Sequence, residues 1–429
     1  MKKIYLMAAM FAVSHAQAQL MTKEVIVANG GIFEFSPPSS DYATIGAYNL
    51  TTQVYTTFDT IKVESISDVE IPLGSGVAFV GASDSIIRYD LFSHQRTHAV
   101  QFNSVKSVST SGDYIIAGKN FGTGDYLTVY NEADLTVEFS ITDADIVQTV
   151  YGGEVIGDSL YVVYNQKGVV DQFPPYFVFN DTLGKIGVID MVNQSFVREI
   201  NLDTAATDIR AIRQINNKLY IACNNGNLIE YDPSTAQTSK TVIDNMGITV
   251  LTFENTETGA EITYKNGLGV DLFNYKVESS IISSPFSIVA NSTIAAGTHD
   301  FVNDVYFTTT TDYSSYGELF IYDGSSIDSL PVQISPEAIA ISYINPSSIS
   351  ELITDEVRIY PNPASNLVTV RTNSRNGSIQ VFDISGKQLS NENYTSDNFQ
   401  LNISNYSAGT YYIVITSSSL RQTTKLIKL

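Results

Sequence analysis

Short segments in which apolar and polar residues alternate, separated by polar turns, recur along most of this chain. The clearest example is residues 217–232, NKLYIACNNGNLIEYD, which contains two such segments, a tight polar turn and a final Asp. Alternation with a period of two residues is the pattern of a half-buried β-strand, and the 3.6-residue period of a helix is nearly absent. The pattern therefore predicts an all-β protein built from short hairpins.

This unit is repeated seven times. In each copy a strand ends in an aromatic or aliphatic residue followed by Asp or Asn, whose side chain can accept backbone N–H groups two residues further on and hold the turn. The seven pairs are Tyr48-Asn49, Tyr89-Asp90, Tyr130-Asn131, Ile189-Asp190, Tyr231-Asp232, Phe273-Asn274 and Tyr322-Asp323, spaced by 41, 41, 59, 42, 42 and 49 residues. Each copy holds four short strands, which is the content of one propeller blade.

The two ends of the repeated region predict how the ring of blades closes. Residues 336–344, PEAIAISYI, resemble an innermost strand with no hairpin after it, and residues 23–31, KEVIVANGG, resemble a second strand with no innermost partner. Pairing these two segments completes the first blade and hides a sheet edge that would otherwise be exposed. We therefore expect a seven-bladed β-propeller over residues 19–345, with an open β-solenoid or two β-sandwiches as the alternatives.

The composition changes at both ends of the chain. Residues 1–18 have the form of a secretory signal peptide, with Lys2 and Lys3, an apolar centre and an Ala-Gln-Ala cleavage site. No Cys follows the apolar run, which argues against a lipoprotein, and no later stretch reaches the roughly 18 apolar residues of a membrane-spanning helix. Residues 346–356 are predicted to be a linker, and residues 357–429 have the short alternating strands of a small antiparallel β-sandwich.

Residues 358–429 closely resemble the type A C-terminal sorting domain of the Bacteroidetes type IX (Por) secretion system. The resemblance rests on the motifs YPNP, VFDISGK and GTYY in this order, followed by a closing KLIKL. The residues that carry the resemblance are Tyr360, Pro361, Asn362, Pro363, Asp383, Gly386, Lys387, Gly409, Tyr411 and Lys425. It implies that the secretion machinery is a partner, that the chain crosses the outer membrane, and that the domain is then removed as the protein is released or attached to the cell surface.

The predicted propeller resembles, more loosely, YncE-like and surface-layer-type bacterial propellers, whose repeat also ends in an aromatic-Asp pair. Some Bacteroidetes surface propellers of this broad kind bind corrinoids, which adds corrinoids and other nutrients to the ligands considered. Those proteins are typically lipoproteins, whereas this chain has no lipobox Cys. For that reason no ligand-binding residue is carried over from them.

The acidity of the chain is confined to the predicted propeller. Residues 19–351 contain 15 Lys and Arg against 40 Asp and Glu, whereas residues 352–429 contain 7 against 5. Nucleic acid and anionic membrane surfaces are therefore poor partners. Either the acidic side chains only keep the protein soluble, or they favour a cation or a cationic ligand.

Side chains suited to catalysis are few. His94 and His98 fall in a predicted turn and are expected to be solvated, while His299 lies beside Asp300. No nucleophile elbow, phosphate loop, zinc ligand set or EF-hand pattern is present, so no catalytic or metal-binding residue is predicted. Calcium is the only cofactor considered, bound weakly by Asp143 and Asp145 or by Asp300 and Asp304. The single Cys, Cys223, lies in the middle of a strand and is expected to be a buried, inert thiol.

Loop lengths give the most specific indication of a binding site. In a propeller the loops between the second and third strands share one face with the connections between blades, and three of them are predicted to be long, at residues 30–45, 166–185 and 308–318. Function concentrates on long loops over a rigid scaffold, and aromatic side chains give contact area at low entropic cost. The predicted ligand contacts are Phe33, Phe35, Tyr42, Phe173, Tyr176, Phe177, Tyr313 and Tyr316.

These features favour a secreted or surface-attached propeller that recognises a glycan, a nutrient or a protein without catalysis. A hydrolase or lyase with an acidic, calcium-assisted site in the propeller channel is one alternative, and an adhesion or assembly module is another. Carboxylates and His299 converging at the channel mouth would favour the enzyme, whereas a mouth lined by Tyr, Phe and amide groups would favour binding.

Overall fold

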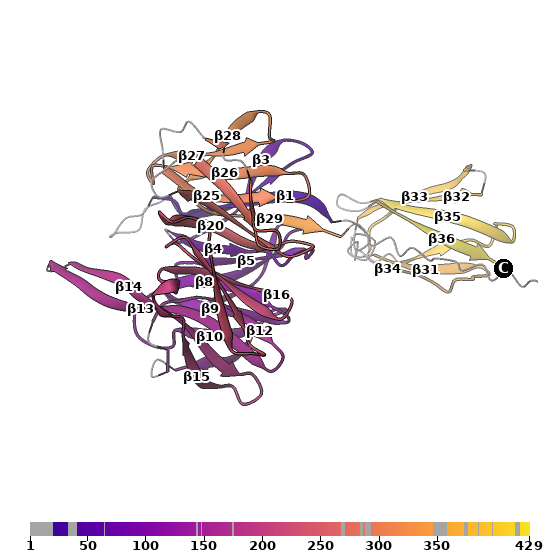
Figure 1. Cartoon of the computed structure of the whole chain (residues 1–429). Coiled ribbons are helices and arrows are strands. Elements are labelled where there is room, and N and C mark those ends of the chain that lie inside the picture. The colour runs from indigo at the N-terminus through magenta and orange to yellow at the C-terminus, as the bar shows by residue number, and fades with distance from the viewer. Residues whose placement is uncertain are drawn as a thin grey trace, which may run out of the picture. The chain divides into compact units, whose positions relative to one another are not determined.

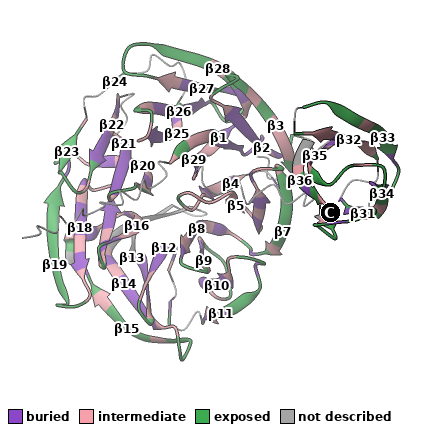
Figure 2. Cartoon of the chain, turned by 90° about the vertical axis from the view of Figure 1, so that its right-hand side faces the viewer, coloured by how far each residue is buried: buried purple, intermediate pink, exposed green. Residues whose placement is uncertain are grey.

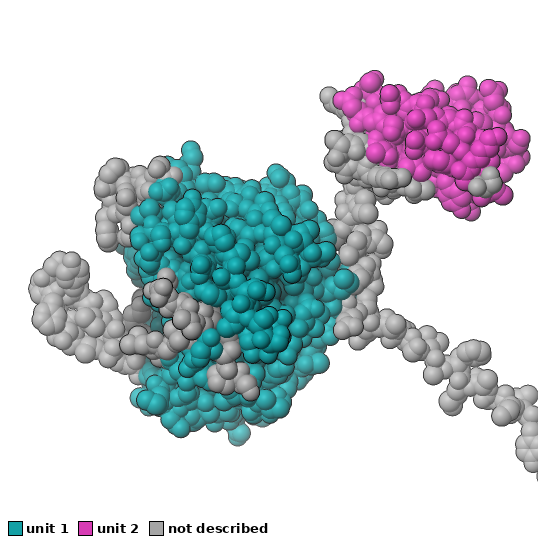
Figure 3. All heavy atoms as spheres, turned by 90° about the horizontal axis from the view of Figure 1, so that it is seen from above, with its two compact units in different colours: residues 1–345 teal, residues 346–429 magenta. Residues whose placement is uncertain are grey.

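The computed structural model describes residues 20–32, 41–63, 65–142, 145–146, 148–173, 176–266, 271–283, 286–287, 293–345, 358–372, 376–384, 386–396, 398–416 and 421–429. The chain divides into two compact units, residues 1–345 and residues 346–429 (Figure 3). The predicted signal peptide, residues 1–18, and the predicted linker, residues 346–356, lie outside the described residues.

Seven antiparallel sheets make up the first unit, and we number them as blades 1 to 7 along the chain. Blade 1 has the strand order β29 (Pro336–Ile344), β1 (Met21–Asn29), β2 (Ala43–Asn49), β3 (Val54–Ile61). Blade 2 has the order β4 (Ile66–Glu70), β5 (Val77–Ala82), β6 (Ser85–Asp90), β7 (Gln95–Gln101). Blade 3 has the order β8 (Val105–Ser111), β9 (Tyr114–Lys119), β10 (Leu127–Asn131), β11 (Val137–Ile141).

The remaining four blades follow the same plan. Blade 4 consists of β12 (Val150–Ile156), β13 (Ser159–Phe173), β14 (Tyr176–Asp190) and β15 (Ser195–Asn201), and a 3-10 helix at Asp203–Ala206 follows it. Blade 5 consists of β16 (Ile209–Ile215), β17 (Lys218–Cys223), β18 (Asn227–Asp232) and β19 (Gln237–Val242). Blade 6 consists of β20 (Ile248–Asn255), β21 (Ala260–Asn266), β22 (Asp271–Lys276) and β23 (Ile281–Ile282), with β24 (Phe286–Ser287) also paired to β22. Blade 7 consists of β25 (Thr293–Asp300), β26 (Val305–Thr311), β27 (Tyr316–Tyr322) and β28 (Ile327–Ile334).

The innermost strands of the seven blades form a closed ring. Strand β4 contacts β29 and β8, β12 contacts β8 and β16, and β20 contacts β16 and β25. Strand β25 in turn contacts β29, so that the last blade meets the first. Figure 2 shows these strands around a common centre, with the exposed strands β7, β15, β19 and β28 at the rim. The predicted seven-bladed β-propeller is confirmed, and the solenoid and two-sandwich alternatives are wrong.

The position of each strand in its blade follows from its apolar pattern. The second strands β5 and β9, with the sequences VAFVGA and YIIAGK, are buried along nearly their whole length because neighbouring blades cover both of their faces. The outermost strands β7 and β19, with the sequences QRTHAVQ and QTSKTV, are exposed along theirs. The hydrophobic core is therefore divided into layers between blades, such as the cluster of Ile26, Val80 and Ile87 between blades 1 and 2.

The two ends of the propeller region pair as predicted. Strand β29 lies antiparallel to β1 in a register that places Ile26 opposite Ala340 and Val27 opposite Ile339. Blade 1 is thus completed by segments from both ends of the repeated region. Because each strand covers an edge of the other, the ring has no unpaired sheet edge at this point.

Asp and Asn side chains hold the turns after the third strands, as the sequence predicted. Asp90 Oδ1 accepts the backbone N–H groups of Phe92 (3.0 Å) and Ser93 (2.7 Å). Backbone hydrogen bonds from Ser326 and Ser325 likewise lower the pKa of Asp323 to about 2. The same kind of bond is made by Asn49, Asn131, Asp190 and Asp232.

The assignment of this turn in blade 6 was wrong by two residues. Strand β22 ends at Lys276, and Tyr275 stands opposite Ile262, whereas Asn274 lies inside the strand and is fully buried. Tyr275 is therefore the counterpart of the aromatic residue in the other blades, and Lys276 stands where they have Asp or Asn. The Phe-Asn pair matched the repeat signature only by composition.

Two of the three predicted long loops are mostly strand. In blade 4, β13 and β14 pair from Ser159 opposite Asp190 to Phe173 opposite Tyr176, so the predicted loop is an extended hairpin that projects from the ring (Figure 1). In blade 7, β26 and β27 leave only residues 312–315 as a turn, held by backbone N–H groups bonded to Asp312 Oδ1. The connection between β1 and β2 in blade 1, residues 30–42, is the remaining long one.

The second unit is a small antiparallel β-sandwich, as predicted. One sheet has the order β30 (Arg358–Tyr360), β31 (Leu367–Arg371), β34 (Asn398–Asn402). The other has the order β33 (Gln388–Tyr394), β32 (Gly377–Asp383), β35 (Gly409–Thr416), β36 (Arg421–Lys428). Buried side chains from both sheets, among them Val368, Val370, Ile379, Ile413 and Leu426, form one core. Among the described residues, no helix has the length and apolar character that crossing a membrane requires.

Candidate ligand-binding channel

A cavity of about 580 Å³ occupies the centre of the propeller. Its lining includes residues from the innermost strand of every blade, β29, β4, β8, β12, β16, β20 and β25. Because these strands run along the channel and each is hydrogen-bonded to a buried second strand, the side chains that line the cavity stand on a rigid frame.

Every innermost strand carries a β-bulge near its first residues. In blade 3, for example, Val105 pairs with Lys119 and Ser107 pairs with Gly118, so that the ladder skips Lys106. The residues skipped in the seven ladders are Ser67, Lys106, Tyr151 with Gly152, Arg210, Leu251, Ala295 and Glu337. A bulge changes the direction of the side chain that it carries, and bulges are enriched beside binding sites.

The bulges produce a ring of seven side chains around the cavity, one from each blade, which we call the bulge ring. It consists of Ser67, Lys106, Tyr151, Arg210, Leu251, Ala295 and Glu337, all of which line the cavity. The blades repeat the same backbone feature but place a different side chain at it. A position whose backbone geometry is the same in every blade, but whose side chain differs, can determine which ligand binds.

In three consecutive blades, the bulge-ring side chains of the first and the third contact that of the middle one. Lys106 Nζ and Arg210 Cζ each lie 5.6 Å from the centroid of the Tyr151 ring. Cations at this distance from an aromatic ring are attracted by its quadrupole. Arg210 also pairs with Asp208 at 2.6 Å, and about a third of each side chain is exposed. One wall of the channel therefore combines two cations with a phenol.

Glu337 differs from the other members of the ring because its carboxylate is used within the protein. Its Oε2 accepts the backbone N–H of Ile66 (2.8 Å) and the hydroxyl of Ser65 (3.0 Å), and its Oε1 accepts the hydroxyl of Ser335 (2.9 Å). Burial raises the pKa of Glu337 despite these bonds. The residue ties the closing strand β29 to the start of blade 2, and we assign it to ring closure.

An ion pair crosses the channel toward the other end of the innermost strands. Arg213 on β16 donates to Glu70 on β4 at 2.9 Å, and both side chains are largely buried. Glu70 also accepts the hydroxyl of Thr110 at 3.0 Å. Blades 2 and 5 are not neighbours, so this pair joins two sides of the ring through its centre.

Further carboxyl groups surround this guanidinium. Burial raises the pKa of Asp68 to about 6 and the pKa values of Glu154 and Glu254 to about 7. Glu254 accepts the hydroxyl of Thr298 (2.8 Å), whereas Glu154 Oε1 is buried without a hydrogen-bond partner among the residues that the structure describes. The charge of Arg213 interacts with all of them. Among the described residues, no group of three or more His, Cys, Asp or Glu side chains is placed to hold a metal ion.

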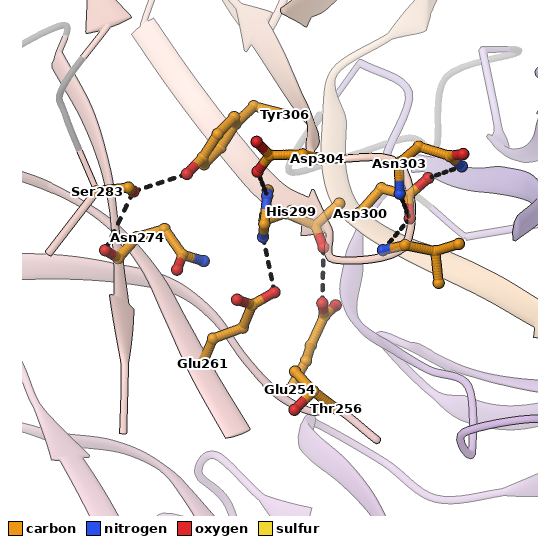
Figure 4. Close-up of polar contacts among 12 residues, drawn as sticks. Glu254, Thr256, Glu261, Asn274, Ser283, His299, Asp300, Asn303, Asp304 and Tyr306 are labelled. Atoms are coloured by element: carbon orange, nitrogen blue, oxygen red, sulfur yellow. Dashed lines mark hydrogen bonds and ion pairs between the residues drawn. The ribbon is translucent and has the colours of Figure 1, made fainter. Parts of the chain in front are cut away.

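His299 lies between blades 6 and 7 and is not part of the cavity lining. Figure 4 shows its ring between Glu261 and Asp304 and beside Tyr306. The Nδ1 atom is 2.8 Å from Glu261 and the Nε2 atom 3.0 Å from Asp304, and the His299 side chain is 1% exposed. Burial opposes the charged imidazole, but the hydrogen bonds and negative charges of Glu261 and Asp304 together outweigh it, so the pKa of His299 is raised. The group has the geometry of a buried ion pair that links two blades.

The other candidates for chemistry also have structural partners. His94, expected to be solvated, instead contacts the buried carboxylate of Glu24 at 3.0 Å and stacks on Phe58 with ring centroids 4.6 Å apart. Cys223 is fully buried, as predicted, and burial raises the pKa of its thiol. Asp300, one of the residues considered for calcium, accepts the hydroxyl of Thr22 at 2.8 Å. Asp143, another of them, lies outside the described residues.

The aromatic side chains predicted as ligand contacts are described only in part. Tyr42 is half-buried, and Tyr313 and Tyr316 are 53% and 66% exposed. Phe33 and Phe35 lie outside the described residues. The backbone of Phe173, Tyr176 and Phe177 belongs to the extended hairpin of blade 4, and their side chains lie outside the described ones.

The bulge ring and the Arg213–Glu70 pair were missed in the sequence. A bulge adds one residue to a strand without breaking its apolar character, so the period-two pattern does not mark it. A comparison of aligned innermost strands would have shown one position with Ser, Lys, Tyr, Arg, Leu, Ala and Glu in otherwise similar segments. That variation was the available signal.

Comparison with known families bears on the second unit. The family model Por_Secre_tail, described as a secretion system C-terminal sorting domain, matches residues 358–429. This match confirms the resemblance based on the YPNP, VFDISGK and GTYY motifs. No curated protein matches the chain in sequence.

The solved structures that are similar to this chain are distant from it. The β-propeller domain of Cps50 (Swd1) from Myceliophteria thermophila is 10% identical, with a TM-score of 0.48, and 69% of this chain and 98% of that chain are covered. A chain of a mitotic checkpoint complex is 11% identical, with a TM-score of 0.48, and 77% and 100% are covered. Hsv2 from Kluyveromyces lactis is 8% identical, with a TM-score of 0.42, and 76% and 98% are covered. The assignment of the propeller rests on the strand pairing described above.

Proposed function

We propose that this chain, a β-propeller that carries a type IX sorting domain and is thereby exported across the outer membrane, is a non-catalytic binding protein. Its ligand enters the central channel from the face on which the blades are connected. The sorting domain implies that the propeller acts at the cell surface or outside the cell. The candidate ligands are therefore extracellular ones, namely a glycan, a nutrient such as a corrinoid, or a segment of another protein.

The bulge ring is the observation that carries this proposal. Seven chemically different side chains surround a cavity of about 580 Å³, and small-molecule sites typically have volumes of roughly 300–1,000 Å³. The side chains stand on strands that are paired and largely buried, so a ligand would meet a preformed site. Preformed sites lose little conformational entropy on binding.

The ends of the second and third strands, between which the sequence predicted these loops, lie on the same face as the bulge ring. Each bulge lies near the start of an innermost strand, directly after the connection from the preceding blade, and the turns between second and third strands share that face. The exposed rings of Tyr313 and Tyr316 on the blade 7 turn would extend the site outward. Blades 1 and 4 would contribute the other predicted contacts.

The position of His299 weighs against the hydrolase or lyase alternative. That alternative required His299 and carboxylates to converge at the channel mouth. Instead, His299 is buried between Glu261 and Asp304 and is absent from the cavity lining. The carboxyl groups in the channel surround Arg213 instead, and Glu70 is paired with it at 2.9 Å.

A ligand screen combined with a blocked channel tests the proposal. The secreted chain would be screened against a glycan array and corrinoids, alongside an Ala295→Trp variant that places a large ring in the cavity. Binding should be lost in this variant, with a melting temperature close to that of the wild type. Thr238→Trp, on the exposed strand β19, is the matched control and should bind normally. A ligand that binds the Ala295→Trp variant as well as the wild type would place its site elsewhere, and a screen without any ligand would favour an adhesion or assembly module.

A further inference from the structure

The charged members of the bulge ring are not distributed evenly around the channel. Lys106 and Arg210 stand in blades 3 and 5, on either side of Tyr151 in blade 4, whereas blades 6 and 7 contribute Leu251 and Ala295. The carboxylate of Glu337 in blade 1 is occupied by bonds to Ser65, Ile66 and Ser335. The ring therefore has a cationic wall in a domain that is otherwise strongly acidic.

The positive charges of Lys106 and Arg210 repel each other, because both side chains lie near the ring of Tyr151. Both lie 5.6 Å from the centroid of Tyr151, which is itself buried with 7% exposure, so the phenol orients the cations rather than offering a free face to a ligand. The cation–π attraction offsets part of the repulsion between the like charges. An anion bound next to these cations would offset more of this repulsion.

Two carboxyl groups lie near the cationic wall. Asp208 pairs with one terminal nitrogen of Arg210, Nη2, at 2.6 Å. Asp68 interacts electrostatically with Lys106, but its Oδ2 accepts the backbone N–H of Val108 at 2.9 Å, and burial raises its pKa to about 6. A guanidinium has five N–H donors in a planar fork, so the pair with Asp208 does not exhaust the donors of Arg210.

We propose that the wall formed by Lys106, Tyr151 and Arg210 binds the carboxylate or phosphate group of a small organic anion in the channel. This inference rests on the proposed binding function and names the ligand class for the same site. The planar guanidinium of Arg210 matches the two oxygens of either group, and the Lys106 ammonium adds a point charge. The apolar side chains of Leu251 and Ala295 leave the other wall suited to the carbon skeleton of the ligand.

Titration calorimetry on the full secreted chain tests this assignment with three probes: galacturonate, galactose and inorganic phosphate. Galacturonate and galactose share a sugar ring and differ by the carboxylate, so preference for galacturonate isolates the contribution of the charge. Lys106→Gln and Arg210→Gln should each weaken binding of the charged probe about ten-fold, because a hydrogen bond to a charged group is lost. Lys240→Gln removes the same charge from the exposed strand β19 and should leave the affinity unchanged.

The outcomes separate this inference from the proposed function on which it rests. Binding of galacturonate alone would identify a carboxylate ligand, and binding of phosphate alone a phosphorylated one, and both results support the cationic wall. Equal affinity for galactose and galacturonate, unchanged affinity in both Gln variants, or no binding of either charged probe would overturn it. A neutral ligand that is excluded by Ala295→Trp would then still support binding in the channel.

Discussion

Arg213 and Glu70 are 143 residues apart in the sequence and form a 2.9 Å ion pair through the centre of the propeller. Each residue stands on the innermost strand of its blade, and the blades are not adjacent. Contacts between neighbouring blades hold each blade only to the next one, whereas this ion pair connects two sides of the ring directly. We infer that the pair restrains the width of the channel at this level.

Replacing Arg213 with Met should destabilise the propeller by about 3–5 kcal/mol at pH 8, because removal of one partner leaves buried carboxylates without a compensating charge. The loss should be smaller at pH 5, where Asp68, Glu154 and Glu254 can take up protons. Chemical denaturation at the two pH values measures this difference.

A matched control is Lys218→Met, which breaks the more exposed pair between Lys218 and Glu230. Exposed ion pairs contribute little to stability, so this variant should unfold nearly as the wild type does. Equal losses in the two variants, or a loss at Arg213 that does not depend on pH, would contradict a role for the central pair.

The raised pKa values of the channel carboxyls predict a specific pH dependence of stability. Burial raises the pKa of Glu154 to about 7, so the folded state keeps a proton on this group that the unfolded state releases above about pH 4.5. The free energy of unfolding should therefore fall as the pH rises from about 5 to 7, by about 1.4 kcal/mol per unit for each such group.

Glu154→Gln tests this dependence at one group, since the amide cannot ionise. The slope of stability against pH between about 5 and 7 should become shallower in this variant, while the stability at pH 5 changes little. A slope identical to that of the wild type would show that Glu154 is already ionised in the folded protein at pH 5. Glu318→Gln, at an exposed residue of β27, is the control for the general effect of removing one carboxylate from the protein.

The fold was predictable because its information is repeated. Seven copies of one strand pattern fix the number of blades, and the incomplete copies at residues 23–31 and 336–344 fix how they close. The errors in the predicted turns and loops arose where the residue types match a pattern that the backbone does not follow. Phe273-Asn274 matches the turn signature but lies inside β22, and the Pro-Pro pair at residues 174–175 suggested a loop where β13 and β14 extend one hairpin.

The site was far less predictable, because it depends on contacts between blades. No local pattern indicates that Lys106, Tyr151 and Arg210 meet, since each stands in a different repeat and the same bulge occurs in all seven. The sequence pointed to aromatic residues on loops instead, because such residues can be identified without knowing which residues of other blades they contact. Residues such as Arg213 and Glu70 acquire their role only when the ring is closed.

Ring closure can be tested at Glu337. Replacing it with Ala leaves the buried N–H of Ile66 and the hydroxyls of Ser65 and Ser335 without their acceptor. We expect a loss of about 2–3 kcal/mol in the free energy of unfolding, as for removal of a hydrogen-bonded charged group. Glu318→Ala, at an exposed residue, should change stability little. A neutral effect at Glu337 would mean that the pairing of β29 with β1 suffices to close the ring.

The sorting domain offers a test that links its structure to export. Asn362, in the YPNP motif, donates to the backbone carbonyl of Lys425 and accepts the N–H of Ile427, both at 2.8 Å, and so clamps the first motif to the last strand. Asn362→Ala should lower the stability of this sandwich by about 1–2 kcal/mol and reduce the fraction of protein at the cell surface. Asn391→Ala, on the exposed strand β33, is the control, and deletion of residues 358–429 should leave the propeller in the periplasm. Surface display of the chain without residues 358–429 would contradict their role in sorting. Normal export of Asn362→Ala, despite a weakened sandwich, would show that the machinery recognises the exposed YPNP motif and does not depend on the hydrogen bonds of Asn362 to the last strand.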